Sequence, residues 1–377
     1  QHCRDIAMCF QQIAARHPQY EPLQLKLKDY RLIAKRGGWP AIKTGKAMKP
    51  GMEDERVPLL RRRLELTGDY QTLGGNPGVF YDAELELAVR SFQQRHSLKV
   101  DGVVGPATLA AMNLPVERRI EQLILSLERL RRLPVHQAGR HVRVNVPSYQ
   151  LVAYDGDSKA LQMDVIVGMR SRQTPEFDNV ITQIGLNPTW TPTQSILRRD
   201  LLPKFRNDPD YVRRGGYQVK NRYTGESMDP WGVDWQSVSA SDVMVVQRSG
   251  RGNALGKVKF LLPNNNSIYL HDTAKPYLFK KARRALSSGC IRLSDPKAFL
   301  DYVIEAQPSE GFDGLRRAYA GSARKHVTLD QPIPVRVTYF TAWINDAGQV
   351  EFYEDIYRKD DRLQLAMERE TRQLASR

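Results

Sequence analysis

The sequence predicts a multidomain α+β protein, and three observations support this fold class. The chain has 377 residues, which is too many for a single small hydrophobic core, so two or three domains are expected. Before His141 the apolar residues recur every three or four positions, which is typical of amphipathic helices, and after it they alternate, which is typical of strands. Hydrophobic residues make up 41% and charged residues 26% of the chain, the balance of an ordinary globular protein.

The first 50 residues are predicted to form a helical scaffold segment and a linker. The helical segment is charged and ends in the breaker sequence Gly37-Gly38-Trp39-Pro40. The linker contains the stretch AIKTGKAMKPGME, which has turn-forming residues and no hydrophobic period.

Residues 51–114 are predicted to form a compact domain of three short helices. Apolar residues at helical spacing mark the first two helices, and Asp82 is placed to cap the second. Gly105 and Pro106 open the third helix, since proline is favourable at the first helical position. Residues 115–140 are expected to hold a longer scaffold helix, because leucine, isoleucine and valine fall on one stripe there.

Residues 141–357 are predicted to form a mainly-β domain. Valines alternate at its start, and Asp155-Gly156 is typical of a hairpin turn. Residues 198–250 lack this alternation and contain paired glycines and two tryptophans, so we expect an inserted loop-and-helix subdomain. A polar C-terminal helix is expected within residues 358–377.

The formal net charge of +15 favours an anionic partner, whether nucleic acid, anionic lipid or a carboxylate-rich polymer. The sequence contains no zinc-finger spacing, RNA-recognition signature or phosphate-binding loop, so no nucleic-acid partner is expected. A solvated basic surface is the simpler alternative, and the charge alone therefore assigns no function.

The chain contains three cysteines. Cys3 and Cys9 fall on different sides of the predicted N-terminal helix, so a bridge between them is not expected. Cys290 stands alone in the sequence. Because no cluster of cysteine and histidine has metal-ligand spacing, we expect neither a metal site nor another cofactor.

One window of the sequence contains the residues that cysteine chemistry needs. His271 closes a predicted strand, and Cys290 lies on a glycine turn before a helix that is predicted to have Ser294 as its cap. A thiol with the ordinary pKa of about 8.5 is mostly protonated at neutral pH, so a nearby imidazole is needed to accept its proton. Gly289 allows close approach of the backbone, and the amides of Gly289 and Cys290 are candidates to hold an oxyanion.

Simpler interpretations of this window stay open at this point. A cysteine beside a glycine is more often a small core residue than a nucleophile, and a histidine at a strand end is usually structural. Ser288 is a poor candidate for the nucleophile, because no Gly-x-Ser-x-Gly elbow surrounds it.

The window as a whole resembles the catalytic domain of the L,D-transpeptidases, of the YkuD type. The residues that match the family's pattern, in chain order, are His271, Ser287, Gly289, Cys290, Ile291 and Arg292. Ser288 departs from the pattern, since many members have a second histidine there. The resulting Ser-Ser-Gly-Cys sequence is similar to that of the large multidomain Gram-negative members, which are periplasmic.

A second resemblance lies upstream. Residues 82–113 look like the small three-helix peptidoglycan-binding module. The residues that carry this resemblance are Phe92, Gln93, Leu98, Val100, Asp101, Gly102, Gly105, Pro106, Thr108 and Leu109. A helical spacer without a ligand is the alternative.

The first resemblance implies a role for each residue of the window. Cys290 is the implied nucleophile and His271 the implied base, and the backbone carbonyl of Asp272 orients the imidazole. Arg292 is a candidate either to stabilise the turn or to bind a substrate carboxylate, with the turn role favoured. The remaining candidates for substrate contact are Ser287, Ser288, Tyr269 and Trp190. Tyr269 and Trp190 are equally well interpreted as core aromatics, and residues 198–250 are implied to form a capping subdomain, a lid over the cleft.

The implied reaction is acyl transfer on peptidoglycan. The donor is a tetrapeptide stem with a diamino acid third and D-Ala fourth, and Cys290 forms a thioester with the third residue as D-Ala leaves. The amine of another stem then attacks the thioester, which gives a 3→3 cross-link. Two alternatives remain: a cysteine L,D-carboxypeptidase acting on the same stems with water as acceptor, and a non-catalytic cell-wall-binding protein.

The expected partners and location follow from this substrate. The partners are peptidoglycan stem peptides and glycan, carbapenem-type inhibitors, which acylate the family, and other wall-synthesis proteins. The protein is expected in the periplasm with a role in cell-wall biogenesis and cell shape. A membrane anchor upstream of Gln1 is also expected, since the chain starts there without methionine.

Overall fold

The computed structural model describes residues 17–71, 78–133, 139–308 and 312–375. Cys3 and Cys9 lie outside these described residues. Among the helices that are described, none is long and apolar enough to cross a membrane. Cys290 is a free thiol.

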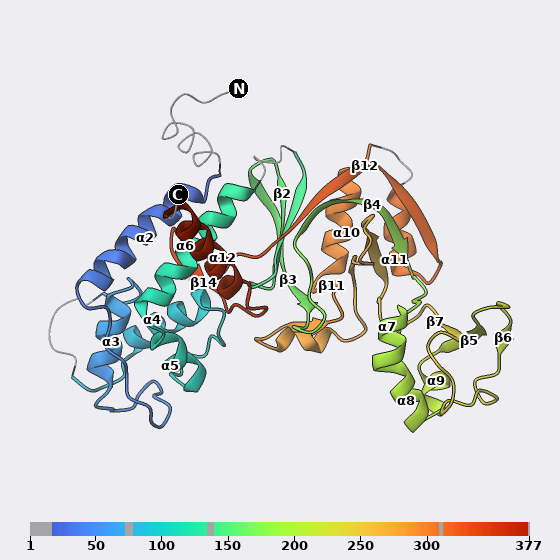
Figure 1. Ribbon diagram of the computed structural model, residues 1–377, viewed down its shortest axis with the longest axis horizontal. Coiled ribbons are helices and arrows are strands. Elements are labelled where there is room, and N and C mark those ends of the chain that lie inside the picture. The colour runs from blue at the N-terminus through green and yellow to red at the C-terminus, as the bar shows by residue number, and fades with distance from the viewer. Residues whose placement is uncertain (1–16, 72–77, 134–138, 309–311, 376–377) are drawn as a thin grey trace. The chain divides into compact units, whose positions relative to one another are not determined.

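The chain forms two compact units. One, the helical unit, consists of residues 1–136 together with residues 339–377, and the other, the sheet unit, consists of residues 137–338. The presence of one mainly helical unit and one unit built on a large sheet confirms the predicted α+β class (Figure 1).

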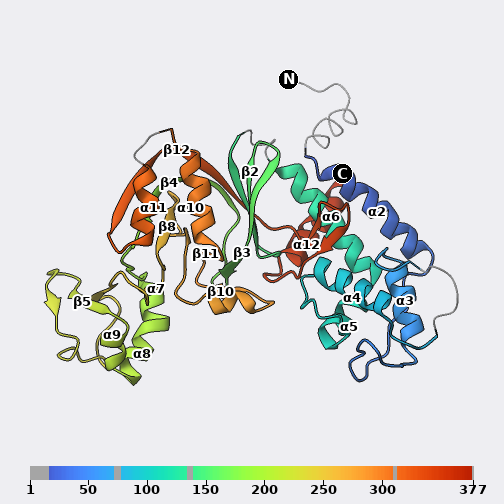
Figure 2. The same cartoon turned by 180° about the vertical axis from the view of Figure 1, so that it is seen from behind.

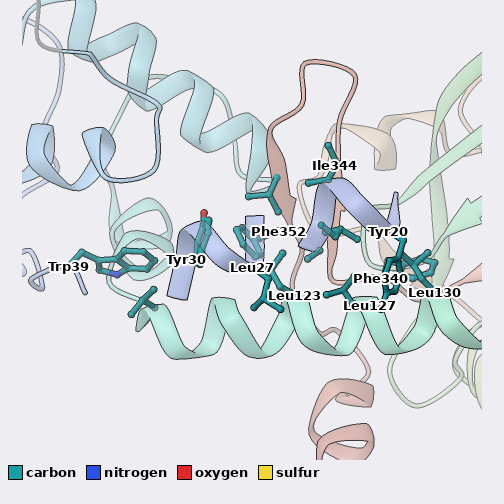
Figure 3. Close-up of a cluster of buried hydrophobic side chains, with 14 residues drawn as sticks. Tyr20, Leu27, Tyr30, Trp39, Leu123, Leu127, Leu130, Phe340, Ile344 and Phe352 are labelled. Atoms are coloured by element: carbon teal, nitrogen blue, oxygen red, sulfur yellow. The ribbon is translucent and has the colours of Figure 1, made fainter. Parts of the chain in front are cut away.

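Two long helices and a hairpin form the first core of the helical unit. Helix α2 (Tyr20–Lys35) packs along helix α6 (Val116–Arg132), and the hairpin of β13 (Ala342–Ile344) and β14 (Val350–Phe352) packs on both helices. Figure 3 shows Leu123, Leu127 and Leu130 of α6 among the buried side chains of this core. The C-terminal helix α12 (Lys359–Ala375) packs against α6.

The hairpin corrects one expectation from the sequence. Residues 339–357 were expected to belong to the mainly-β domain, because their apolar residues alternate as in a strand. The last strand of the large sheet, β12 (Lys325–Thr338), ends before them, and the hairpin that follows buries Phe352 and Ile344 against helices instead. Alternation shows that a strand has a buried face but does not show which element covers that face.

The expected three-helix domain occupies its own core within the helical unit. Its helices are α3 (Val57–Glu65), α4 (Ala83–Arg95) and α5 (Pro106–Met112). Asp82 caps α4, as predicted, by accepting a hydrogen bond from the backbone of Leu85 at 2.8 Å. Pro106 is the first residue of α5, also as predicted.

A buried glutamine holds the turn between the second and third helices of this domain. The side chain of Gln93 donates to the Asp101 carboxylate at 3.0 Å and accepts from the Gly102 backbone at 2.9 Å. Gly102 has a φ of +71°, which favours glycine. Gln93, Asp101 and Gly102 are among the residues that resemble a peptidoglycan-binding module, so that resemblance reflects a requirement of the fold.

The sheet unit is built on one nine-stranded sheet, which closes because β2 also pairs with β3. The strands, in spatial order, are β10 (Ala285–Ser287), β3 (Ser158–Gly168), β11 (Ile291–Leu293), β9 (Leu270–His271), β8 (Val258–Leu261), β4 (Phe177–Leu186), β12 (Lys325–Thr338), β1 (His141–Asn145) and β2 (Gln150–Asp155). Helix α10 (Pro296–Glu305) packs against β3, and α11 (Asp313–Ala320) packs against β4 (Figure 2).

The inserted segment forms a lobe with its own hydrophobic core. The lobe contains α7 (Gln194–Ile196), a π-helical turn (Leu197–Leu201), α8 (Leu202–Asn207), α9 (Asp210–Arg214), β5 (Tyr217–Asn221), β6 (Ser227–Met228) and β7 (Val243–Gln247). Phe205 and Trp235 lie in its core. The sequence predicted loops and helices here, whereas the lobe also contains a three-stranded sheet, whose short strands lack a long alternating pattern.

The helix after Cys290 begins later than expected. A short strand, β11, separates it from Cys290, and the cap is Asp295, which accepts from the backbone of Ala298 at 2.9 Å. The prediction of Ser294 as cap is therefore wrong. Pairing of β11 with β3 and β9 keeps the chain extended through Leu293, which moves the start of the helix to Pro296.

A buried ion pair leads to a stability prediction for the helical unit. Arg95 of α4 donates from its guanidinium to both carboxylate oxygens of Asp69, and their side chains are 3% and 0% exposed. Asp69→Ala leaves a buried guanidinium without its partner, so we expect the free energy of unfolding, measured by urea titration, to fall by about 3–5 kcal/mol. The control is Asp29→Ala, which breaks an exposed pair with Lys26 and should cost at most about 1 kcal/mol. Equal losses for the two variants would contradict the prediction.

Candidate active site

His271 is held between two strands of the sheet unit. It pairs with Lys259 of β8 and with Arg292 of β11, and its side chain is buried, at 4% exposure. The ring atom Nδ1 lies 2.5 Å from the backbone carbonyl oxygen of Asp272. Because a carbonyl oxygen only accepts hydrogen bonds, Nδ1 carries the hydrogen, and the neutral ring has its lone pair on Nε2.

The side-chain carboxylate of Asp272 holds this residue in place, and the backbone carbonyl of the same residue orients the imidazole. It accepts hydrogen bonds from the backbone of Lys257 at 2.7 Å and from its neighbour Thr273 at 2.6 Å. Gly256 leaves room for it, because a Cβ atom at that position would lie 2.2 Å from the carboxylate, and the φ of Gly256 is +61°. This use of the Asp272 side chain was not predicted from the sequence, which assigned a role only to its backbone.

Cys290 follows a tightly braced turn. Gly289 has a φ of +117°, and a Cβ atom there would lie 2.8 Å from the side chain of Ile268. The hydroxyl of Ser287 donates to the carbonyl of Cys290 at 2.6 Å and accepts from the amide of Gly289 at 3.1 Å. The buried hydroxyl of Thr174, from the segment after β3, donates to the carbonyl of Gly289 at 2.7 Å.

These contacts change what can be expected of the turn. The Gly289 amide, a candidate for holding an oxyanion, is already bonded to Ser287, so Cys290 offers the amide that remains for that purpose. Arg292 was favoured as a turn-stabilising residue, but its guanidinium forms no hydrogen bond to any described residue, and its Nε is buried without a partner. Ser287 and Thr174 brace the turn instead. Thr174 was not predicted, because it lies more than a hundred positions from Cys290.

The thiol and the imidazole are near neighbours but are not bonded to each other in this structure. Cys290 Sγ donates to the backbone carbonyl of Ser267 at 3.4 Å, and no hydrogen bond joins it to His271. The ring centroid of Tyr269 is 5.6 Å from that of His271, and the Tyr269 hydroxyl interacts with Cys290 and Trp190. Tyr269 and Trp190 thus lie beside Cys290, and their contact with a substrate stays a prediction.

Two pockets meet at Cys290. The first, of about 670 Å³, also contains Ser267 and is called the Ser267 pocket; the second, of about 590 Å³, also contains His271 and is called the His271 pocket. The residues that line both are Trp190, Ile196, Leu255, Tyr269, Ser288 and Cys290. Ser287 and Arg292 line the His271 pocket but not the Ser267 pocket.

The inserted lobe forms one wall of the His271 pocket. Lys204, Tyr211 and Tyr217 of the lobe line this pocket together with His271 and Cys290. The backbones of Trp190 and Gln247 exchange two hydrogen bonds, of 3.0 and 2.8 Å, which tie β7 of the lobe to the segment after β4. The lobe is therefore attached next to the His271 pocket and supplies part of its lining.

Burial sets the protonation states of the two reactive groups. It lowers the pKa of His271 to about 3, and the positive charge of Arg292 contributes to this shift. Burial also raises the pKa of the Cys290 thiol, against smaller opposing effects of Tyr269 and Arg292. At neutral pH both groups are therefore uncharged. Among the described residues, no cluster of three or more acidic, histidine or cysteine side chains is arranged to hold a metal ion.

Two families match this chain. Residues 139–310 match the family described as "L,D-transpeptidase catalytic domain" (YkuD), and residues 53–112 match "Putative peptidoglycan binding domain". A Haemophilus influenzae protein named "Putative L,D-transpeptidase" is 33% identical over 250 residues, which cover 65% of this chain and 49% of that protein. The Mycobacterium tuberculosis protein "N-acetylmuramoyl-L-alanine amidase CwlM" is 39% identical over 80 residues, 19% of this chain and 20% of its own. The chain thus spans about half the length of the first relative and a fifth of the second.

Solved L,D-transpeptidase structures align with the chain only loosely. One from Stackebrandtia nassauensis has a TM-score of 0.30 and 14% identity, covering 79% of this chain and 96% of that one. Another, of residues 123–326 from Xylanimonas cellulosilytica, has a TM-score of 0.24 and 14% identity, covering 78% and 98%.

The protonation states lead to a prediction for thiol reactivity. Only the thiolate reacts with iodoacetamide, so a raised pKa moves the rise in reactivity to higher pH. We expect the alkylation rate of the Cys290 peptide, followed by mass spectrometry from about pH 6 to about pH 10, to have its midpoint above about 8.5, the ordinary pKa of a thiol, because burial raises the pKa of this one. A midpoint near or below neutral pH would instead show a preformed thiolate–imidazolium pair. His271→Gln should leave the midpoint above about 8.5 as well, because the imidazole is uncharged over this range.

Proposed function

We propose that this protein is a peptidoglycan L,D-transpeptidase that forms 3→3 cross-links through a thioester on Cys290, because residues 139–310 match the L,D-transpeptidase catalytic domain (YkuD) and residues 53–112 match a peptidoglycan-binding domain. One observation carries the proposal: Cys290, on a rigid turn, lines both of two adjoining pockets, one of which contains a buried neutral histidine. A nucleophile shared by two pockets suits a reaction in which a donor and an acceptor react in turn with one atom.

The first half of the reaction is acylation. As the donor stem enters, the thiol leaves the Ser267 carbonyl by rotation about its Cα–Cβ bond and gives its proton to Nε2 of His271. The sulfur attacks the carbonyl carbon of the third stem residue, and the Cys290 amide stabilises the oxyanion. The bond to D-Ala then breaks, and His271 returns the proton to the departing amine. The products are a thioester on Cys290 and free D-Ala.

The second half is transfer to the acceptor. The side-chain amine of a diamino acid on another stem attacks the thioester carbonyl, and His271 accepts the proton that the amine loses. The carbon–sulfur bond breaks, an amide joins the two third residues, and the thiol of Cys290 is restored. The Asp272 carbonyl keeps Nδ1 protonated through both halves, so Nε2 remains the atom that moves the proton.

The main alternative is hydrolysis, in which water replaces the amine and the product is a tripeptide stem. The lobe beside the His271 pocket supports transfer, because excluding water from the thioester favours the amine. The position of the Cys290 thiol, which lines both pockets, argues against a non-catalytic wall-binding role. If residues 53–112 bind the glycan or peptide, they raise the local concentration of substrate for the catalytic domain.

The proposal extends to location and inhibition. A cell-wall enzyme of this family works outside the cytoplasm, and we propose the periplasm and a part in wall biogenesis and cell shape. A carbapenem mimics the acyl donor, and opening of its β-lactam ring by Cys290 would leave a stable acyl-enzyme. The predicted membrane anchor and the predicted wall-synthesis partners stay predictions.

A product assay tests the proposal. Purified disaccharide-tetrapeptides are incubated with the protein, and the products are separated and weighed; we expect D-Ala together with cross-linked dimers. Cys290→Ala should abolish both products, and His271→Gln should slow both by roughly a thousandfold, because residues of one catalytic unit are needed together. Cys9→Ala, which replaces a cysteine that lies outside the described residues, is the matched control and should retain activity.

Each other outcome assigns a different function. Tripeptides without dimers would show a carboxypeptidase. Dimers from Cys290→Ala would show that another group is the nucleophile. An unmodified Cys290 peptide after carbapenem exposure, with no turnover of tetrapeptide, would favour a wall-binding protein.

A further inference from the structure

The His271 pocket contains more positive charge than its own acidic groups neutralise. The charged residues that line it, apart from the histidine, are Asp200, Lys204, Arg214, Lys275 and Arg292. Asp200 is paired with Arg172, and Arg214 is paired with Asp208 and Asp210. Lys204, Lys275 and Arg292 form no ion pair with any described residue, so three cations face this pocket without a carboxylate.

Arg292 is the most unusual of the three. Its guanidinium forms no hydrogen bond with any described residue, and its Nε atom is buried. Burial lowers the pKa of Arg292, which shows that its charge is poorly solvated. A buried donor without a partner normally costs about 1–3 kcal/mol, and more when it is charged, so a ligand group that accepts a hydrogen bond from it recovers this cost.

The two lysines reach the same pocket from different segments. Lys204 lies on α8 of the inserted lobe, where its Nζ is 5.5 Å from the ring centroid of Tyr211, and Lys275 lies just after His271 and β9. Both side chains are exposed. The Ser267 pocket differs, because Arg172 there is paired and Lys259 is its one unpaired cation among the described residues.

We propose that the His271 pocket is a carboxylate-binding site in which Arg292, Lys204 and Lys275 hold a carboxylate of the stem peptide beside Cys290. The guanidinium of Arg292 can bind both oxygens of one carboxylate, and the lysines add charge at the pocket wall. The site makes the enzyme specific for stems that carry a free carboxylate near the scissile bond. This assignment rests on the proposed function, and it names the chemical group by which the substrate is recognised.

Two groups of the donor stem can supply this carboxylate. One is the side-chain carboxylate of the third residue, where that residue is a diaminodicarboxylic acid, and the other is the terminal carboxylate of D-Ala. Both are carboxylates, but each can be removed separately by converting it to an amide. Three donors therefore distinguish them: the unmodified tetrapeptide, a tetrapeptide amidated on the diamino acid, and a tetrapeptide amidated on D-Ala.

The experiment measures kcat/KM for release of the fourth residue from each donor. Lys204→Gln, Lys275→Gln and Arg292→Gln should each lower kcat/KM for the unmodified donor by about ten- to a hundredfold, the usual value of a hydrogen bond to a charged group. For the donor that lacks the recognised carboxylate, the same substitutions should change little, because the interaction is already lost. The donor that shows this loss of sensitivity identifies the source. Arg292→Lys should retain part of the activity.

Lys280→Gln is the matched control, since Lys280 is an exposed lysine of the same segment as Lys275 but does not line the pocket. Lys280→Gln should leave kcat/KM unchanged for all three donors. The carboxylate site would be overturned if the substitutions lowered kcat/KM equally for all three donors, or if Lys280→Gln lowered kcat/KM as much as they do. Either result would show only a general effect of positive charge. If Arg292→Gln fails to fold, the lysine variants decide the same question. Failure of the wild-type protein to release any D-Ala would instead refute the proposed function.

Discussion

The turn before Cys290 is the constraint on which the rest of the site depends. Its backbone is possible only because Gly289 adopts a φ of +117° and has no side chain to strike Ile268. Hydrogen bonds from Ser287 and Thr174 then hold both ends of the turn. The thiol is thereby presented at the boundary of two pockets, and neither donor nor acceptor has to reach into the core of the sheet unit.

The histidine is positioned by a separate device. Asp272 supplies the carbonyl that holds one nitrogen of the ring, and its own carboxylate is anchored to the backbone beside Gly256. Burial keeps the imidazole neutral, so a free lone pair is available for a proton at any physiological pH. Since the resting thiol is bonded to Ser267, reaction requires a movement of one side chain, which substrate entering the pocket can drive.

Local signals in the sequence predicted much of this architecture. The change from helical to alternating spacing at His141 marks the start of the sheet unit, and Asp82 and Pro106 act where capping and proline preferences put them. The sequence window also predicted that folding brings the imidazole of His271 within bonding reach of the Cys290 sulfur; both residues line one pocket, but no hydrogen bond joins them in this structure. What it missed depends on contacts between distant positions: the Thr174 brace, the anchored Asp272 carboxylate and the packing of the β13–β14 hairpin on helices. No local pattern encodes such contacts, because each arises only when separate elements pack.

In the proposed reaction, Cys290 carries the acyl group between donor and acceptor. The direct measurement is the mass of the protein mixed with tetrapeptide donor in the absence of acceptor and quenched rapidly in acid. We expect an increase equal to the donor less D-Ala, located by proteolysis on the peptide that contains Cys290 and lost on addition of an amine acceptor. A donor that releases D-Ala while Cys290 stays unmodified at every time, or an adduct on another residue, would contradict the account.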